Sequence, residues 1–137
     1  MKKLSPYLTF NGNCREAMKF YQKCLGGKLQ FQTAGGSPMS EKMPAKMKRT
    51  IVHASLISEN FELMGSDMVG DQGLIKGNAI AVSVSFATEK ALRSCYKKLS
   101  YDAIHTYPVQ HNFYGILFGS LTDRYGTHWL LNCPKDQ

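Results

Sequence analysis

Residues 5–27, SPYLTFNGNCREAMKFYQKCLGG, combine a short extended segment with an amphipathic helix. Residues 5–11 read as a strand, and Asn13 followed by Glu16 three positions later has the spacing of a capping box, which predicts a helix start. The Gly26–Gly27 pair predicts its end. Between these signals, apolar side chains recur with the 3.6-residue period of one helix face, at Cys14, Ala17, Met18, Tyr21, Cys24 and Leu25.

The rest of the first half of the chain favours strands. Residues 34–48 are rich in Gly, Ser, Pro, Met and Lys without periodicity, and we expect a mobile loop there. Residues 70–77 have the composition of a linker. Apolar alternation predicts strands at 28–33, 51–58 and 61–66, of which the last two are joined by a tight turn at Glu59–Asn60.

The second half repeats this plan. A strand at 79–86 precedes a helix capped by Thr88 and ending at Leu99, and three strands follow near 103–107, 115–122 and 127–132. Ala17 and Ala91, Met18 and Leu92, and Leu25 and Leu99 are all separated by 74 positions. The sequence therefore predicts an α+β fold, with one domain over residues 1–137 made of two βαβββ modules at about 1–70 and 71–137.

Composition limits the possible partners. The chain has 17 Lys and Arg against 10 Asp and Glu, a formal charge of +7, which favours anionic partners. Its densest basic stretch, residues 42–49, contains Pro44 and no aromatic residue, so we interpret it as a solvated loop and expect no nucleic-acid partner. No apolar run approaches the roughly 20 residues that span a bilayer, and residues 1–6 lack a signal-peptide pattern. We therefore expect no membrane partner and a cytoplasmic location.

The cysteines predict no disulfide framework. Cys14, Cys24, Cys95 and Cys133 are scattered without a CxxC pair, and two of them fall on apolar helical positions. We interpret them as reduced structural residues. Zinc binding by this set is the alternative, but the spacing matches no structural zinc pattern.

Alternate residues of a strand face opposite sides of a sheet, so parity sorts the predicted strands into two faces. The face predicted to pack under the helices is apolar: Leu8, Phe10, Val52, Ala54, Leu56, Phe61, Leu63, Ile80, Val82, Val84, Leu121, Trp129 and Leu131. The other face is mixed: Tyr7, Thr9, His53, Ser55, Glu62, Met64, Ala79, Ala81, Ser83, Phe118, Ser120, Leu130 and Asn132. A mixed face of this kind suits a ligand cleft, and the alternative is a half-solvated antiparallel sheet.

Candidate binding residues follow from this face and from the aromatic residues near it. His53 sits at mid-strand, where an imidazole is suited to acid-base chemistry, although a hydrogen-bonded structural histidine is the favoured interpretation. Ser66–Asp67 and Asp123 occupy positions where such side chains cap local backbone groups. We assign no catalytic residue. The predicted binding set is Tyr7, His53, Glu62, Met64, Tyr114 and Phe118.

Three blocks of sequence resemble one family. They are residues 5–14 with Phe20–Tyr21 and 25–27; residues 51–54 with 63–67; and Phe118–Gly119 with 122–126 and 129–132. Together they resemble the PhnB-like branch of the vicinal oxygen chelate (glyoxalase/bleomycin resistance/dioxygenase) superfamily. The resemblance implies paired βαβββ modules forming a U-shaped mixed sheet around a cleft, commonly in a homodimer.

The resemblance also implies where a metal would bind. Metalloenzymes of the superfamily hold a divalent ion through four His or Glu side chains, and matching the motifs puts Pro6 or Tyr7, Glu62 or Met64, Ala79 and Leu130 at these positions. One carboxylate cannot hold such an ion at useful affinity. Members of the branch are sometimes labelled methyltransferases, but the sequence has no glycine-rich loop after a first strand to cradle S-adenosylmethionine.

We therefore predict a binding protein with a degenerate metal site, no metal and no cofactor, which takes an unidentified small molecule in the sheet cleft. The alternative is an enzyme of the lyase, isomerase or dioxygenase type, metal-dependent or metal-free, that acts on a small metabolite.

Overall fold

The computed structural model describes residues 1–36 and 40–134. The chain forms two compact units, Met1–Ile75 and Lys76–Gln137, each with its own sheet and helix. Among the described residues, no helix has the length and apolar character needed to cross a bilayer.

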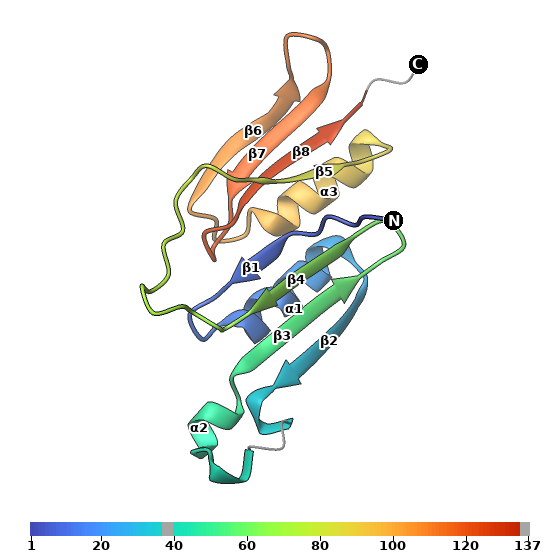
Figure 1. Cartoon of the computed structure of the whole chain (residues 1–137). Coiled ribbons are helices and arrows are strands. Elements are labelled where there is room, and N and C mark those ends of the chain that lie inside the picture. Colours follow the sequence, from blue (N-terminus) through green and yellow to red (C-terminus); the bar gives the residue numbers. More distant parts are fainter. Residues whose placement is uncertain (37–39, 135–137) are drawn as a thin grey trace. The chain divides into compact units, whose positions relative to one another are not determined.

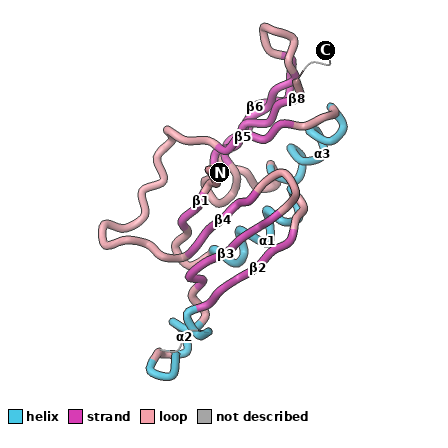
Figure 2. The backbone as a smooth tube through the Cα atoms, turned by 45° about the vertical axis from the view of Figure 1, so that its right-hand side comes forward, coloured by secondary structure: helices cyan, strands magenta, loops and turns pink. Residues whose placement is uncertain are grey.

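The first unit is a four-stranded mixed sheet covered on one side by a helix (Figures 1 and 2). Strand β1 pairs in parallel with β4, and β4, β3 and β2 form antiparallel pairs, so the order is β1-β4-β3-β2. Helix α1 packs against β2, β3 and β4. The bounds are β1 Tyr7–Thr9, α1 Cys14–Leu25, β2 Lys28–Thr33, β3 Ile51–Ile57 and β4 Glu62–Ser66.

The segment predicted as a mobile loop over 34–48 contains regular turns. Its described residues form the 3-10 turns η1 Ala34–Gly36 and η2 Ser40–Lys42 and the one-turn helix α2 Ala45–Lys48. That the segment is mobile stays a prediction. Residues 37–39 lie outside the described residues. Glycine and proline disfavour long helices but allow single turns, and a single turn is too short to show a helical period.

The second unit repeats the βαβββ order and the sheet topology of the first, without counterparts of η1, η2 and α2 among its described residues. Strand β5 pairs in parallel with β8, and the sheet order is β5-β8-β7-β6, with α3 packed on β7 and β8. The two predicted βαβββ modules and the α+β class are confirmed. The bounds are β5 Val82–Ser85, α3 Glu89–Leu99, β6 His105–His111, β7 Leu117–Thr122 and β8 His128–Cys133.

The predicted core face is largely correct. In the first unit the buried residues of this face are Ala54, Leu56 and Leu63 on strands and Phe10 directly after β1, and in the second unit they are Leu121, Trp129 and Leu131. Ile80 contradicts the prediction, because its side chain is 83% exposed. It precedes β5, which begins at Val82 rather than at Ala79, so strand parity does not apply to it.

A bulge between β2 and β3 changes the face of one further residue. Gln32 pairs with His53 and Thr33 pairs with Ile51, which leaves Val52 without a direct partner. An extra residue of this kind reverses side-chain alternation locally. Of these two neighbours, Ile51 is therefore the buried one, with 1% of its surface exposed. Val52, which parity predicted to lie in the core, is only half-buried.

The predicted capping box of α1 does not form. Asn13 occupies the N-cap position, but its side chain makes no capping hydrogen bond. Instead the Asp67 carboxylate accepts hydrogen bonds from the backbone N–H groups of Gly12 at 3.0 Å and Cys14 at 2.9 Å, and from that of Ile51 at 3.2 Å. One carboxylate thus ties the start of α1 to the adjoining ends of β3 and β4. At α3 the predicted cap is confirmed, since Thr88 Oγ1 accepts from the Ala91 N–H at 3.1 Å.

Asp123 organises the turn between β7 and β8. The side chain is fully buried, and Oδ1 accepts from the backbone N–H groups of Tyr125 at 2.8 Å and Thr127 at 3.1 Å, which confirms the predicted local cap. Its Oδ2 accepts from the Trp129 indole N–H at 2.8 Å. A buried carboxylate is tolerated when donors satisfy it in this way.

All four cysteines are free, and three are buried. Burial, with a contribution from the nearby Asp67 charge, raises the pKa of Cys14 to about 12, and burial raises the pKa of Cys95 to about 11. These two thiols stay protonated near neutral pH, so they act as small apolar residues rather than nucleophiles.

We predict that Asp67→Ala destabilises the protein far more than Asn13→Ala. The first change leaves three backbone donors without their acceptor and should lower the free energy of unfolding by about 1–3 kcal/mol. The second removes no hydrogen bond of the cap and should cost less than about 0.5 kcal/mol. Urea unfolding of the two variants measures the difference. A larger loss for Asn13→Ala would contradict this account of the cap.

Candidate functional site

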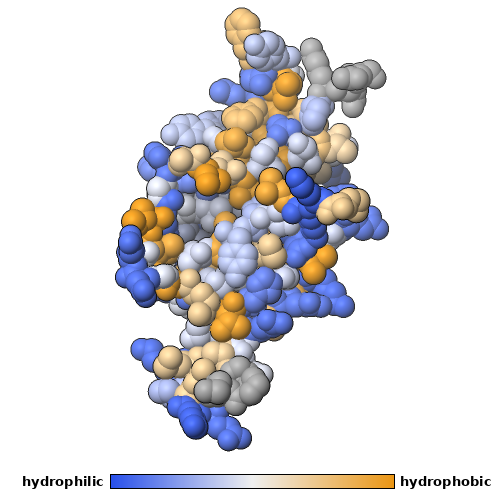
Figure 3. Space-filling model, in the orientation of Figure 1, coloured by the Kyte–Doolittle hydropathy of each residue, from blue (hydrophilic) through white to orange (hydrophobic). Residues whose placement is uncertain are grey.

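The face of the first sheet turned away from α1, termed the open face, carries a row of three paired residues. Tyr7 on β1 lies opposite Met64 on β4, and Met64 lies opposite Ser55 on β3. Directly opposed residues share a face, so the three side chains are neighbours. The side of the first unit seen in Figure 3 mixes hydrophilic and hydrophobic groups, in contrast to the apolar face under α1.

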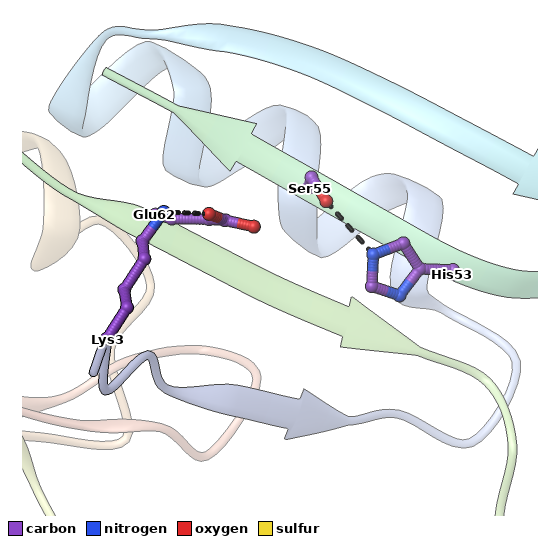
Figure 4. Close-up of polar contacts among 4 residues, drawn as sticks. All are labelled: Lys3, His53, Ser55 and Glu62. Atoms are coloured by element: carbon purple, nitrogen blue, oxygen red, sulfur yellow. Dashed lines mark hydrogen bonds and ion pairs between the residues drawn. The ribbon is translucent and has the colours of Figure 1, made fainter. Parts of the chain in front are cut away.

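His53 is held between two hydroxyl groups on this face. Its Nε2 lies 3.0 Å from Ser55 Oγ (Figure 4), and its Nδ1 lies 3.4 Å from the Tyr7 hydroxyl, a long hydrogen bond. A hydroxyl can both donate and accept, so either neutral tautomer of the imidazole is accommodated, and the protonated form can donate to both oxygens. Both ring nitrogens are engaged, so what the arrangement offers a ligand is the remaining donor or acceptor capacity of the two hydroxyls.

Glu62 lies on the same face, two residues before Met64 along β4. Its side chain is 20% exposed, and its carboxylate forms an ion pair with the ammonium of Lys3, whose side chain is 65% exposed (Figure 4). Lys3 belongs to the segment before β1, which contains no helix or strand.

Four of the six predicted site residues therefore come together. Tyr7, His53, Glu62 and Met64 share the open face of the first unit. Phe118 lies on the corresponding face of the second sheet, opposite Asn132, and is half-buried. Tyr114 stands in the turn between β6 and β7 and is 78% exposed. That all six line one cleft stays a prediction.

The predicted binding set left out two residues that contact its members, Ser55 and Lys3. Ser55 was placed on this face by parity but not in the binding set, and its spacing two positions after His53 was the available signal. Lys3 gave no signal, because nothing in residues 1–6 predicts an ion pair with a residue 59 positions away.

The other histidines are not part of this face. His128 donates from Nε2 to the Gly77 carbonyl at 3.0 Å, and its Nδ1 lies 2.7 Å from the Thr122 hydroxyl. A carbonyl only accepts, so the neutral ring carries its proton on Nε2 and has no free nitrogen. His105 and His111 are exposed on the edge strand β6.

The residues at the positions implied for a metal do not fit one. Ala79 is exposed before β5 and Leu130 is a half-buried residue of β8, and neither side chain has a donor atom. Within residues 1–36 and 40–134, no three His, Cys, Asp or Glu side chains gather in a way that could hold an ion. We therefore derive no metal-dependent step.

A hollow of about 330 Å³ lies in the second unit, beside the start of α3. It is lined by Ala87, Thr88, Glu89, His111, Gly115, Leu117, Cys133 and Pro134. None of the six predicted binding residues borders it, so the hollow and the open face of the first unit are separate features.

Comparison with known proteins identifies the family. The family model for 3-demethylubiquinone-9 3-methyltransferase matches residues 2–132. Protein YjdN of Escherichia coli is 31% identical, over 98% of this chain and 97% of that protein. Protein PA1353 from Pseudomonas aeruginosa is 33% identical with a TM-score of 0.85, over 99% of this chain and 100% of that one.

More distant structures share the fold. A putative 3-demethylubiquinone-9 3-methyltransferase, PhnB protein, from Bacillus cereus is 26% identical with a TM-score of 0.73, over 97% of this chain and 100% of that one. A bleomycin-binding protein complexed with bleomycin is 15% identical with a TM-score of 0.59, over 98% and 100%, and shows the fold alone. As its resemblance to PhnB-like proteins predicted, the chain belongs to the 3-demethylubiquinone-9 3-methyltransferase family, and it shares its fold with structures of the glyoxalase/bleomycin resistance/dioxygenase superfamily.

Proposed function

We propose that this protein binds a small organic molecule on the open face of its first sheet, with Tyr7, His53, Ser55 and Met64 in contact with the ligand. The observation that carries the proposal is the His53 imidazole, placed between two hydroxyls on a face that α1 does not cover. Polar groups of this kind fix the orientation of a ligand, while the Tyr7 ring and the Met64 thioether supply apolar contact.

The family fold is compatible with this function. The bleomycin-binding protein, which shares the fold at 15% identity, is complexed with bleomycin. That Phe118 and Tyr114 of the second unit also contact a ligand stays a prediction from the sequence. Methyl transfer, which the family description names, is not proposed, because the sequence lacks the glycine-rich loop of a Rossmann-type S-adenosylmethionine site.

A second candidate function is enzymatic. The observation that favours it is again His53, since an imidazole between two hydroxyls can pass a proton to or from a bound metabolite. The binding function is preferred because the open face has no carboxylate hydrogen-bonded to His53 and no metal-ligand set in the described residues.

We also propose a homodimer and a cytoplasmic location. Four large apolar side chains, Leu4, Ile75, Ile80 and Phe113, are strongly exposed in the single chain, and exposed apolar surface favours association into a dimer.

The proposed cytoplasmic location rests on the cysteines, because four free thiols suit a reducing compartment.

Binding is tested first by a thermal-shift screen of the full chain against a library of small metabolites. Tyr7→Ala and His53→Ala should each lower the affinity for a ligand found in this way by about two- to tenfold, because each removes a neutral hydrogen bond or an aromatic contact. Lys19→Ala, on the exposed side of α1, is the matched control and should leave the affinity unchanged. A ligand insensitive to both site variants would reject the open face as the binding site.

The metal content is a separate prediction. Protein purified without a histidine tag should contain well under one equivalent of Zn, Ni, Mn or Fe by elemental analysis, since Ala79 and Leu130 have no donor atoms. Added divalent ions should not support turnover of a hemithioacetal. Stoichiometric metal that survives dialysis, or such turnover, would overturn the prediction.

The homodimer is tested by light scattering at micromolar concentration. We expect about twice the mass of the 15.3 kDa chain. A mass of a single chain over the whole concentration range would contradict it.

A further inference from the structure

Among the residues that the structure describes, Glu62 brings a carboxylate to the open face of the first sheet. Its side chain is 20% exposed and lies on β4, two positions from Met64 and diagonal to Tyr7 across the β1–β4 pair. Such diagonal neighbours lie about 7–8 Å apart, within reach of one small ligand. A ligand in contact with Tyr7 and Met64 would therefore meet this carboxylate.

Among the described residues, the cation bound to Glu62 is the Lys3 ammonium. The Lys3 side chain is 65% exposed and comes from a segment without helix or strand, so Lys3 is weakly restrained. Exposed ion pairs contribute little stabilising free energy, equivalent to about a two- to fivefold change in an equilibrium constant. Another ammonium group can therefore displace Lys3 at small cost.

The same geometry disfavours an anionic ligand. An anion would have to separate Lys3 from Glu62 and then lie beside an unpaired carboxylate. The net charge of +7 attracts anions at long range, but charges farther than about 8 Å are largely screened at physiological salt. The neighbouring Tyr7 ring adds an aromatic surface, which attracts cations.

We infer that Glu62 is the charge-recognition residue of this site and that the ligand carries a cationic nitrogen, an ammonium or similar group, which takes the place of the Lys3 ammonium. The inference rests on the proposed binding function and specifies its ligand class. Lys3 then acts as an internal competitor: its ammonium occupies the carboxylate when no ligand is bound.

The test uses three matched probes that share a phenyl ring: phenethylamine as the cation, phenethyl alcohol as the neutral probe and phenylacetate as the anion. Each is titrated into the isotope-labelled full chain at neutral pH, and the amide shifts of Tyr7, His53 and Met64 report binding at the open face. The amine should bind at least threefold more tightly than the alcohol, and the anion should bind more weakly than both.

Three variants separate the roles of the charges. Lys3→Gln should increase the affinity for phenethylamine by about two- to fivefold, because the competing ammonium is gone. The affinity for phenethyl alcohol should not change. Glu62→Gln should reduce the affinity for phenethylamine to that for phenethyl alcohol. Lys28→Gln is the matched control: Lys28 lies in the same cross-strand row through Ile57 but makes no ion pair with Glu62, so it should change the amine affinity little.

The outcomes distinguish this inference from the function on which it rests. Equal binding of amine and alcohol, tighter binding of the anion, or an amine affinity unaffected by Glu62→Gln would overturn the ligand class while leaving the open face as a binding site. Absence of shifts at the open face with all three probes would count against both.

Discussion

Each sheet of this protein has one helix to cover it, and a sheet has two faces. Because side chains alternate along every strand, packing under α1 or α3 uses one half of the strand residues and leaves the other half free of the core. The buried set is therefore apolar, from Phe10 to Leu63 in the first unit and from Leu121 to Leu131 in the second. The opposite faces carry polar groups, of which Ser55 and Ser66 in the first sheet are buried as well.

Two carboxylates hold the strands in the register that this division requires. Asp67 binds backbone N–H groups at the start of α1 and at the start of β3, so the ends of three elements meet at one side chain. Asp123 binds two backbone N–H groups of its own turn and the Trp129 indole, which joins the turn to the core under α3. The row of Tyr7, Met64 and Ser55 follows from the backbone pairing of β1, β4 and β3, and Asp67 ties β3 to the residue that follows β4.

The chemistry of the open face differs from that of a metal centre on the same fold. A divalent ion needs several oxygen or nitrogen ligands around one point, whereas here hydroxyls and an imidazole form a hydrogen-bonded chain and the single carboxylate is paired with Lys3. Such a face can offer a ligand directional hydrogen bonds and one charge, as proposed above. Membership of the family thus supplies the architecture, while the side chains of this chain decide what the site can hold.

Local patterns in the sequence were sufficient for the helices, the repeated βαβββ order and most of the buried face, because the 3.6- and 2-residue periods are properties of neighbouring residues. Four of the six residues predicted to bind a ligand lie on one face, as parity predicted, and their binding role stays a prediction. Only the tertiary structure decided the rest. The bulge that buries Ile51 depends on pairing with β2, the cap of α1 comes from Asp67 rather than from the adjacent Asn13, and Glu62 is paired with Lys3, 59 positions away. Each involves residues distant in sequence, whose proximity results from strand pairing and core packing rather than from local propensity.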